Sequence, residues 1–282
     1  MSRQPLLGIV VGKKGVGKTF TTNKLIFNYI TGRMGLGAPP RKVLILDVND
    51  EFTHVPAIAV SDVIKFSGQD IIEARRIRRM KPNGVPMTID EVVDALRICI
   101  DYFRGGLLLL EDTNKYITEN VPGDLNGALC GLRHVDTDVI LHYQGLGAIP
   151  PKMWRNFNWI RYHKCSEFVK DEKDKFKGRE RDLSVVEALV NHEFDKGGDG
   201  EHFYVYYEEK DDKIRGAYSQ KMLYNAILIY LEENYNSVIK PHFNRFDIRS
   251  GSYKKPEPQK VVQEVASKLF KDLYGGSMPI AA

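Results

Sequence analysis

The sequence predicts a three-layer α/β fold with a mostly parallel central sheet. Short apolar runs alternate with amphipathic segments over the first 165 residues, and this alternation is typical of strand–helix–strand units with parallel strands. The composition agrees, because 43% of the 282 residues are hydrophobic and 28% are charged. This composition is that of an ordinary globular protein, and it excludes wholesale disorder.

The N-terminal part begins with a strand, a helix and a second strand. Residues 6–11 form a continuous apolar run, which predicts a buried strand of a parallel sheet. The helix that follows is expected over 18–31, because Gly32 is a natural residue just past a helix end. A second buried strand is expected over 43–46 and leads into Asp47.

The later elements continue the alternation. Thr88 and Glu91 have the spacing of a capping box, which opens a predicted helix with an apolar face that extends to Phe103. Four leucines at 107–110 predict a strand that runs into two acidic residues. The other expected elements of this region are short strands at 63–66 and 76–80, a helix from Asp124 to about His134, and strands at 139–143 and 159–163.

The C-terminal part differs in composition. Residues 166–200 carry dense mixed charge and glycine, which favours a solvated, mobile insertion. The further expected elements are a hairpin from 202–207 and 213–218, a helix capped by Ser219, and a short helix at 261–274. We therefore expect one domain over 1–235 that contains the charged insertion, followed by a basic tail over 236–282 with a short helix.

The composition also limits the class of function. The sequence has 41 Lys and Arg against 37 Asp and Glu, a net charge of +4, which permits a nucleic-acid partner without demanding one. Cys99, Cys130 and Cys165 are well separated, which argues against a disulfide framework or a zinc site and fits a reducing compartment. No apolar run approaches the roughly 20 residues that cross a bilayer. We expect a soluble, cytoplasmic protein (in the host cytoplasm if it is viral) with no membrane partner.

Residues 12–19, GKKGVGKT, match the phosphate-binding pattern G-x-x-x-x-G-K-[ST] between a predicted strand and a predicted helix. Glycines let consecutive backbone N–H groups converge on a phosphate, and the helix N-terminus adds partial positive charge. Lys18 is expected to reach the β- and γ-phosphates of ATP, and Thr19 to bind Mg²⁺. A glycine-rich turn that binds nothing is the alternative. The predicted nucleotide-binding residues are Gly12, Lys13, Lys14, Gly15, Val16, Gly17, Lys18 and Thr19.

Acidic residues follow two of the predicted strands. A hydrolysing site needs one carboxylate near Mg²⁺ and a second that polarises the attacking water. Because ligands bind at the carboxyl ends of strands in open α/β sheets, we expect Glu111 to orient the Mg²⁺ shell and Asp112 to orient the water. Asp47 ends the other strand and competes for a place in the cofactor site. Acids that merely cap strand ends are the alternative.

Taken in order, these motifs resemble the FtsK–HerA ATPases, ring motors that pump DNA in chromosome segregation, conjugation and phage packaging. Residues 47–52 supply the D-x-x-x-E-[FY] turn of the HerA branch. The resemblance implies a three-layer P-loop NTPase fold of the RecA/ASCE type over residues 5–165. The family usually has Asp then Glu after the third core strand, whereas this chain has Glu111 then Asp112. This exchange leaves Glu51 as a second candidate for the base that activates water.

The resemblance also implies residues that read the γ-phosphate. Gln144 ends a predicted strand, which is the position of the family's γ-phosphate sensor. Arg133 lies late in a predicted helix and matches the arginine that reaches into the neighbouring subunit's site, with Arg155 as the runner-up. A loop-facing glutamine, and a surface arginine paired with Asp136 or Asp138, are the alternatives.

The family likeness implies ATP-driven translocation of double-stranded DNA by a ring, with six subunits as the expected number. The small size of the chain favours a packaging motor of a virus or mobile element, with a portal, a capsid or another complex as a further partner. Two other functions stay open. One is a morphogenesis or export ATPase like the zonula occludens toxin-type phage proteins, and the other is a nucleotide-binding scaffold that hydrolyses weakly.

Two basic regions are candidates for contact with DNA. The first is a run on a predicted strand, made up of Arg75, Arg76, Arg78, Arg79 and Lys81. The second is the tail, where Phe243, Phe246 and Tyr253 interleave with lysines and arginines. Basic residues neutralise phosphates and aromatic rings stack on bases. A solvated face, a subunit contact or a docking tail is the alternative reading of these regions.

Overall fold

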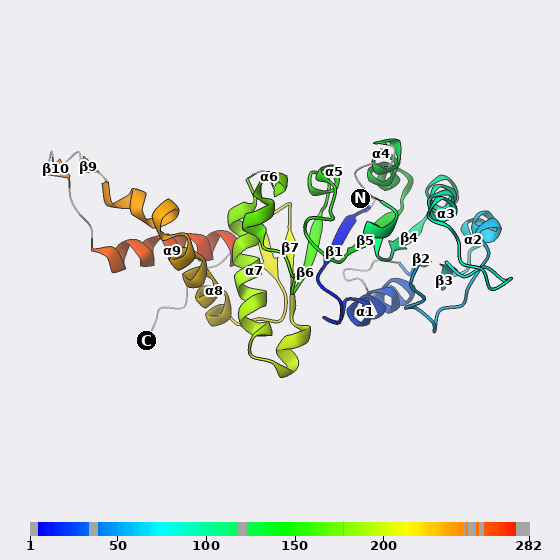
Figure 1. The fold of residues 1–282 in the computed structure, drawn as a ribbon, viewed down its shortest axis with the longest axis horizontal. Helices are drawn as coiled ribbons and strands as arrows, with labels where there is room; N and C mark the ends of the chain where they lie inside the picture. The colour runs from blue at the N-terminus through cyan, green and yellow to red at the C-terminus, as the bar shows by residue number, and fades with distance from the viewer. Residues whose placement is uncertain are drawn as a thin grey trace. The chain divides into compact units, whose positions relative to one another are not determined.

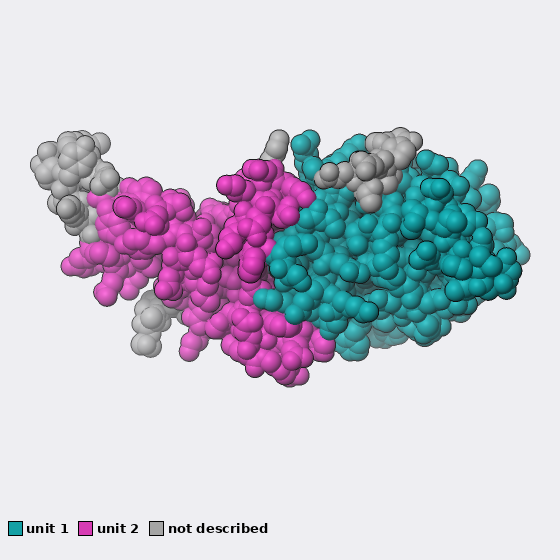
Figure 2. All heavy atoms as spheres, in the orientation of Figure 1, with its two compact units in different colours: residues 1–167 teal, residues 168–282 magenta. Residues whose placement is uncertain are grey.

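The computed structural model describes residues 5–33, 39–117, 123–176, 178–244, 246–247, 252–253 and 257–274. The chain divides into two compact units, residues 1–167 and 168–282 (Figure 2). Unit 1 has the predicted α/β fold with a parallel sheet. The compact units divide after residue 167. The expected domain boundary after residue 235 is a different division of the chain, and it stays a prediction.

The described part of unit 1 is built on parallel strands, which Figure 1 draws from blue to green. They are β1 (Leu7–Val11), β2 (Lys42–Asp47), β3 (Ala74–Arg78), β4 (Gly106–Leu110), β5 (Asp138–Tyr143) and β6 (Trp159–His163). Their order across the sheet is β3-β2-β4-β5-β1-β6, and each neighbouring pair is parallel. Every residue of β1, β2, β4 and β5 is buried, as in a sheet covered on both faces.

Helices cover the two faces of this sheet. They are α1 (Lys18–Thr31), α2 (Val63–Gly68), α3 (Ile89–Tyr102), α4 (Gly123–Gly131) and α5 (Pro151–Trp154). Figure 1 shows α1 on one side of the strands and α3 and α4 on the other. Ile26 and Tyr29 of α1 belong to a core cluster with Val43 and Ile45 of β2. The strand predicted over 63–66 is wrong, because these residues form α2.

Local sequence signals set the ends of two helices. Gly17 before α1 and Gly32 after it both adopt left-handed backbone conformations, with φ of 82° and 70°, which glycine accepts without strain. At α3 the capping box forms, because the Thr88 hydroxyl accepts from the Glu91 amide at 3.2 Å and the Glu91 carboxylate accepts from the Thr88 amide at 2.8 Å. The predicted starts of α1 at Lys18 and of α3 after Thr88 are both confirmed.

Unit 2 is mostly helical. Its helices and strands are α6 (Lys173–Phe176), α7 (Glu180–Phe194), β7 (Tyr204–Glu208), β8 (Lys213–Arg215), α8 (Gln220–Glu233), β9 (Phe246–Asp247), β10 (Ser252–Tyr253) and α9 (Pro258–Tyr274). The antiparallel pair β7–β8 is the predicted hairpin, and α8 begins after Ser219 as predicted. None of the helices described in either unit is long and apolar enough to span a membrane.

The prediction of a solvated, mobile insertion over 166–200 is wrong for the residues of α7. Leu183, Val186, Leu189 and Val190 are all buried in this helix. They recur at spacings of three and four residues, which is the period of an amphipathic helix. The dense charge of the segment lies before them, at 170–182, and Glu187 alone is charged between Leu183 and Val190, so the overall composition concealed a largely apolar helix.

The strand order determines where the residues after each strand meet. β4, β5 and β1 are neighbours and run parallel, so their carboxyl ends lie at one edge of the sheet. The register pairs Leu110 with Leu141 and Val11 with Tyr143. The segments that follow these three strands therefore come together, and they carry most of the predicted site.

Candidate active site

The predicted phosphate-binding loop connects β1 to α1 and folds around the Lys18 side chain. Lys18 Nζ donates to the carbonyl oxygens of Gly12 at 2.5 Å and Lys13 at 2.9 Å. Gly15 has a φ of 87°, and no atom lies within 4 Å of the place a Cβ would take, so this part of the loop faces open space. At Gly12 a Cβ would lie 2.6 Å from Cβ of His163, so a larger residue would push the loop away from β6.

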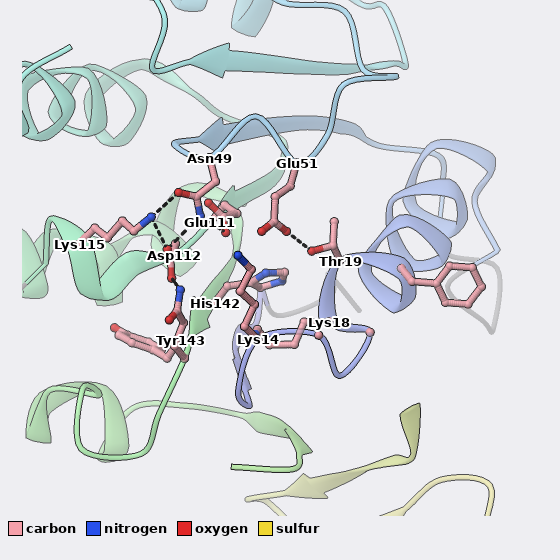
Figure 3. A pocket seen from close by; sticks show the side chains of 14 residues that line it. Lys14, Lys18, Thr19, Asn49, Glu51, Glu111, Asp112, Lys115, His142 and Tyr143 are labelled. Carbon is pink, nitrogen blue, oxygen red and sulfur yellow. Dashed lines mark hydrogen bonds and ion pairs between the residues drawn. The ribbon is translucent and has the colours of Figure 1, made fainter. Parts of the chain in front are cut away.

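A cleft of about 630 Å³ opens beside this loop (Figure 3). Four segments line it: the loop with the first turn of α1, the turn after β2, the end of β4, and the end of β5. The lining residues are Lys14, Gly15, Gly17, Lys18, Thr19, Phe20, Asn49, Glu51, Glu111, Asp112, Lys115, His142, Tyr143 and Gln144. The cleft thus unites most of the predicted site residues. Gly12, Lys13 and Val16 belong to the loop but do not line the cleft, and Val16 is buried.

Glu111 places a half-satisfied carboxylate in the cleft wall. It is 5% exposed, and its Oε1 accepts from Asn49 Nδ2 at 2.9 Å. Its Oε2 is buried and has no hydrogen-bond partner among the described residues. Burial, together with the nearby charges of Glu51 and Asp112, raises the pKa of Glu111 to about 8. A buried oxygen without a partner is costly unless a ligand, a cation or water satisfies it.

Asp112 is held by three side chains. Its Oδ1 accepts from Gln144 Nε2 at 2.7 Å, and its Oδ2 lies 2.9 Å from Asn49 Nδ2 and 2.8 Å from Lys115 Nζ. Burial acts to raise the pKa of Asp112, but these three donors outweigh it and leave the pKa below the usual range. The structure therefore places Asp112 and Gln144, which were predicted separately, in direct contact.

Thr19 and Glu51 meet across the cleft. The Thr19 hydroxyl donates to Glu51 Oε2, and Figure 3 shows this contact beside Lys18. Burial lowers the pKa of Lys18, while the charges of Glu51 and Asp112 act in the opposite direction. The predicted phosphate-binding lysine and the predicted acids thus share one electrostatic environment.

Asp47 does not line the cleft, so its predicted place in the cofactor site is not supported by the geometry. Its side chain is fully buried, and Oδ1 accepts from the backbone N–H of Glu51 at 2.9 Å. Oδ2 accepts from the backbone N–H of Phe52 at 3.0 Å and from Arg76 Nη1 at 2.8 Å. Asp47 therefore shapes the turn that carries Asn49 and Glu51 into the cleft.

The predicted basic run on β3 is not a free phosphate-binding surface. Arg76 is 6% exposed and pairs with Asp47 and Asp50, so the prediction that it contacts DNA is wrong. The other members are engaged as well: Arg78 with Asp50, Arg75 with Glu73, Lys81 with Glu91, and Arg79 with the carbonyl oxygen of Met87. For Arg76 and Arg78 the cause is the parallel pairing of β3 with β2, which sets them beside the acids at and just after the end of β2.

Several predicted contacts lie partly outside the described residues. The backbones of Arg133, Phe246 and Tyr253 are described, but their side chains are not. Arg155 is exposed just after α5, and Phe243 is partly buried. The identity of the trans-acting arginine and the DNA contacts of the tail therefore stay predictions.

A buried polar cluster supports the first turn of α1. Arg161 of β6 is fully buried, and its Nη2 donates to the carbonyl oxygen of Lys18 at 3.2 Å and to the Thr22 hydroxyl. His142 Nε2 lies 3.0 Å from the same hydroxyl. Burial, with the charges of Arg161 and Lys18, lowers the pKa of His142 well below the usual range, so its imidazole is neutral. These contacts orient the turn from which Lys18 extends.

Sequence reasoning missed five residues that line the cleft, and two of them, Asn49 and Lys115, bond the predicted acids. The other three are Phe20, His142 and Tyr143. Asn49 lies between Asp47 and Glu51, inside the motif that carried the family resemblance, so its position was a usable signal. Lys115 lies three residues after Asp112, within the short helical turn η2 (Thr113–Lys115). No motif points to Lys115, because the turn that brings it back to Asp112 is apparent only in the folded chain.

No protein-family model and no curated protein matches this sequence. Among solved structures, the genome packaging NTPase B204 from Sulfolobus turreted icosahedral virus 2 matches with a TM-score of 0.51 in complex with ATP-γS and 0.53 in complex with sulfate. The identities are 13% and 14%, over 76% and 75% of this chain and 97% and 95% of B204. This chain has a P-loop NTPase fold.

The P-loop NTPase fold that the family resemblance implied is thus confirmed. The N-terminal domain of zonular occludens toxin from Neisseria meningitidis also matches, at 13% identity over 58% of this chain and 79% of that domain. Its TM-score of 0.32 is too low to carry an argument.

The P-loop NTPase fold implies a Mg²⁺ ion, and the donors of the cleft fit one. Mg²⁺ prefers oxygen ligands and keeps several waters, with one or two protein ligands beside the phosphates of the substrate. The Thr19 hydroxyl and the unpartnered Oε2 of Glu111 are such oxygens. The described residues hold no cluster of three or more His, Cys, Asp or Glu side chains that would bind a metal by themselves.

Proposed function

We propose that this chain is an ATP-hydrolysing subunit of a ring that translocates double-stranded DNA during packaging of a viral or mobile-element genome. One observation carries the proposal: the P-loop lysine, the Asp112–Gln144 pair and the half-satisfied Glu111 converge on one cleft. The fold that the chain shares with a genome packaging NTPase supports the proposal.

Each of these side chains has a step to perform. The loop backbone and Lys18 bind the β- and γ-phosphates at the N-terminus of α1. Asp112, held against Gln144, orients a water for in-line attack on the γ-phosphorus. The water oxygen forms its bond to phosphorus while the P–O bond to the β-phosphate bridge breaks, which yields ADP and phosphate. The proton of the water passes to a cleft carboxylate, Asp112 or Glu51.

Thr19 and Glu111 are the residues that we propose hold Mg²⁺. When bound, this ion supplies positive charge that offsets the negative charge developing on the transferred phosphate. Glu111 is suited to this role because its buried Oε2 lacks another partner in the described structure.

Ring formation adds a contribution from a second subunit. We propose six subunits, with ATP between neighbours and Arg133 or Arg155 reaching the γ-phosphate from the adjacent copy. Such an arginine stabilises the charge that develops in phosphoryl transfer. The tail over 236–282 is a candidate for contact with DNA or with a portal, capsid or other complex.

ATP hydrolysis by the purified full chain, with and without double-stranded DNA, tests this function. We expect DNA to stimulate the wild-type rate and Lys18→Ala to lower kcat at least about 100-fold, because Lys18 contacts the reacting phosphates. Lys65→Ala is the matched control, since Lys65 is an exposed lysine on α2 outside the cleft. This variant should hydrolyse ATP like the wild type.

The alternatives give different results in the same assay. Hydrolysis that is indifferent to DNA of any form contradicts the translocase and favours an export ATPase. Nucleotide binding without measurable hydrolysis favours a scaffold. A mass measurement with a non-hydrolysable ATP analogue tests the ring, and a persistent monomer contradicts it.

A further inference from the structure

Lys115 brings a third ammonium group to the cleft. Lys14 and Lys18 come from the P-loop, whereas Lys115 ends the short turn η2 that follows β4. Figure 3 shows Lys115 beside Asn49 and Asp112, across the cleft from Thr19. Phosphates held by the P-loop would therefore have positive charge on both sides.

The Lys115 side chain is held in place yet keeps a donor to spare. Its Nζ lies 2.8 Å from Asp112 Oδ2 and donates to Asn49 Oδ1. An ammonium group has three N–H donors, and within the described residues these two acceptors account for two of them. The side chain is 40% exposed, so a ligand in the cleft can reach the third.

Asn49 fixes the place of this ammonium group. Its amide nitrogen donates to Glu111 Oε1 and to Asp112 Oδ2, each at 2.9 Å, while its amide oxygen accepts from Lys115. The amide cannot turn without losing these bonds together, so the network is stiff. Gln144 binds the other oxygen of Asp112. Lys115 is thereby fixed within one network with the predicted γ-phosphate sensor.

We propose that Lys115 binds the terminal phosphate of a nucleoside triphosphate and enables the cleft to distinguish a triphosphate from a diphosphate. This inference rests on the proposed function, because it takes the P-loop to hold the nucleotide. The P-loop holds the β-phosphate, and the terminal phosphate extends from it toward the residues that activate water. There the third N–H of Lys115 donates to a γ-oxygen while the other two stay bonded to Asp112 and Asn49.

The charges explain why a lysine is needed at this position. A terminal phosphate close enough for attack by a water on Asp112 puts two negative groups near each other in a partly buried site. Their repulsion is strong where water is scarce. Lys115 lies against one of these groups and can bond the other, so it offsets the repulsion only when the terminal phosphate is present. A diphosphate does not reach this position.

Binding of ATPγS and of ADP to the full chain, each titrated by calorimetry, tests the assignment. We expect Lys115→Ala to weaken ATPγS binding roughly 10- to 100-fold, the effect of losing a hydrogen bond between charged groups, and to change ADP binding less than about 2-fold. Lys115→Arg should restore most of the ATPγS affinity, since it keeps the charge and the donors. Lys65→Ala, on the exposed face of α2, should bind both nucleotides like the wild type.

Thermal unfolding of each variant separates this role from a structural one. If the Lys115–Asp112 pair only stabilises the fold, Lys115→Ala lowers the melting temperature and affects both nucleotides alike. An equal loss for ATPγS and ADP, or no loss for either, overturns the assignment. A wild-type chain that binds neither nucleotide instead overturns the proposed function, so the two failures are distinguishable.

Discussion

Two neighbouring strands of unit 1 end in acidic residues, and the two ends differ in what surrounds them. β2 ends at Asp47 and β4 runs into Glu111, with Leu46 and Leu110 paired between them. Both oxygens of Asp47 accept hydrogen bonds, from two backbone N–H groups and from Arg76. Glu111 keeps one buried oxygen without a partner in the described structure. The first acid is structural, and the second is available to a ligand.

The donors that surround each acid make the difference. β2 is flanked by β3, which supplies the guanidinium of Arg76. At the end of β4, the donor to Glu111 Oε1 is the neutral amide of Asn49, and Gln144 at the end of β5 binds Asp112 instead. A buried carboxylate beside a guanidinium has its charge neutralised within the fold. A carboxyl whose donor is a neutral amide is not neutralised within the fold, so it takes up a proton or binds a cation. The donor that each acid meets, a guanidinium for Asp47 or an amide for Glu111, therefore separates a structural acid from a functional one.

Asp112→Asn gives the largest expected effect. We expect kcat for ATP to fall about 1,000-fold, because the variant keeps the hydrogen bond from Gln144 but loses the charge that polarises water. Stability should fall modestly, because the single oxygen of the amide can still accept from Gln144 while its NH2 group faces the donors of Asn49 and Lys115. Steady-state hydrolysis and thermal unfolding, measured on the same preparation, test both statements. A variant that hydrolyses ATP normally would transfer the role of the base to Glu51.

Asp47→Asn has the opposite signature. We expect the free energy of unfolding to fall by about 2–4 kcal/mol, because the charge of Arg76 loses its buried partner and keeps only the partly exposed Asp50. Below the unfolding transition, kcat should stay within a few-fold of the wild type. Urea unfolding and steady-state kinetics measure the two effects.

A double variant separates two effects of Asp47→Asn: the loss of the ion pair with Arg76 and the weakening of the turn that Asp47 shapes. In Asp47→Asn with Arg76→Met, no unpaired guanidinium is left against the amide, so the double variant should be more stable than the sum of the single effects predicts. Additive effects would contradict the argument that Arg76 is what makes Asp47 structural.

Strong local signals made much of the fold predictable. The glycines at the ends of α1, the capping box at Thr88 and the apolar run of β4 each act within a few residues. The failures have equally local causes. Residues 63–66 are too few for their apolar pattern to distinguish a strand from α2. At α7 the dense charge of residues 170–182 drew attention away from the apolar run that begins at Leu183.

The candidate site was predictable only as far as its motifs extend. Lys18, Thr19 and Glu111 follow from the P-loop and the strand that ends in acids, and they do line one cleft. The engagement of Arg76 by Asp47 could not be predicted, because its partner lies 29 residues away and depends on which strands are neighbours. A run of arginines in a sequence carries no information about which acids will face it.

The pH dependence of stability gives the smallest expected effect and tests the other side of the comparison. The pKa of Glu111 is raised from 4.5 to about 8, so the folded chain binds this proton more tightly than the unfolded chain does. Its contribution to stability is therefore fully present below pH 4.5 and is lost as the pH rises to about 8. Glu111→Gln lacks this loss. Without nucleotide and metal, we expect the variant to gain about 1–2 kcal/mol relative to the wild type between pH 6 and pH 8.

Urea unfolding at several pH values between 5 and 9, in the presence of a chelator, measures this difference. The sign is decisive: a carboxyl that the fold keeps neutral makes the wild type lose stability relative to Glu111→Gln as the pH rises. If the two proteins keep a constant difference over the whole range, Glu111 is already charged and satisfied at low pH. It would then resemble Asp47, and the contrast between the ends of β2 and β4 would not hold.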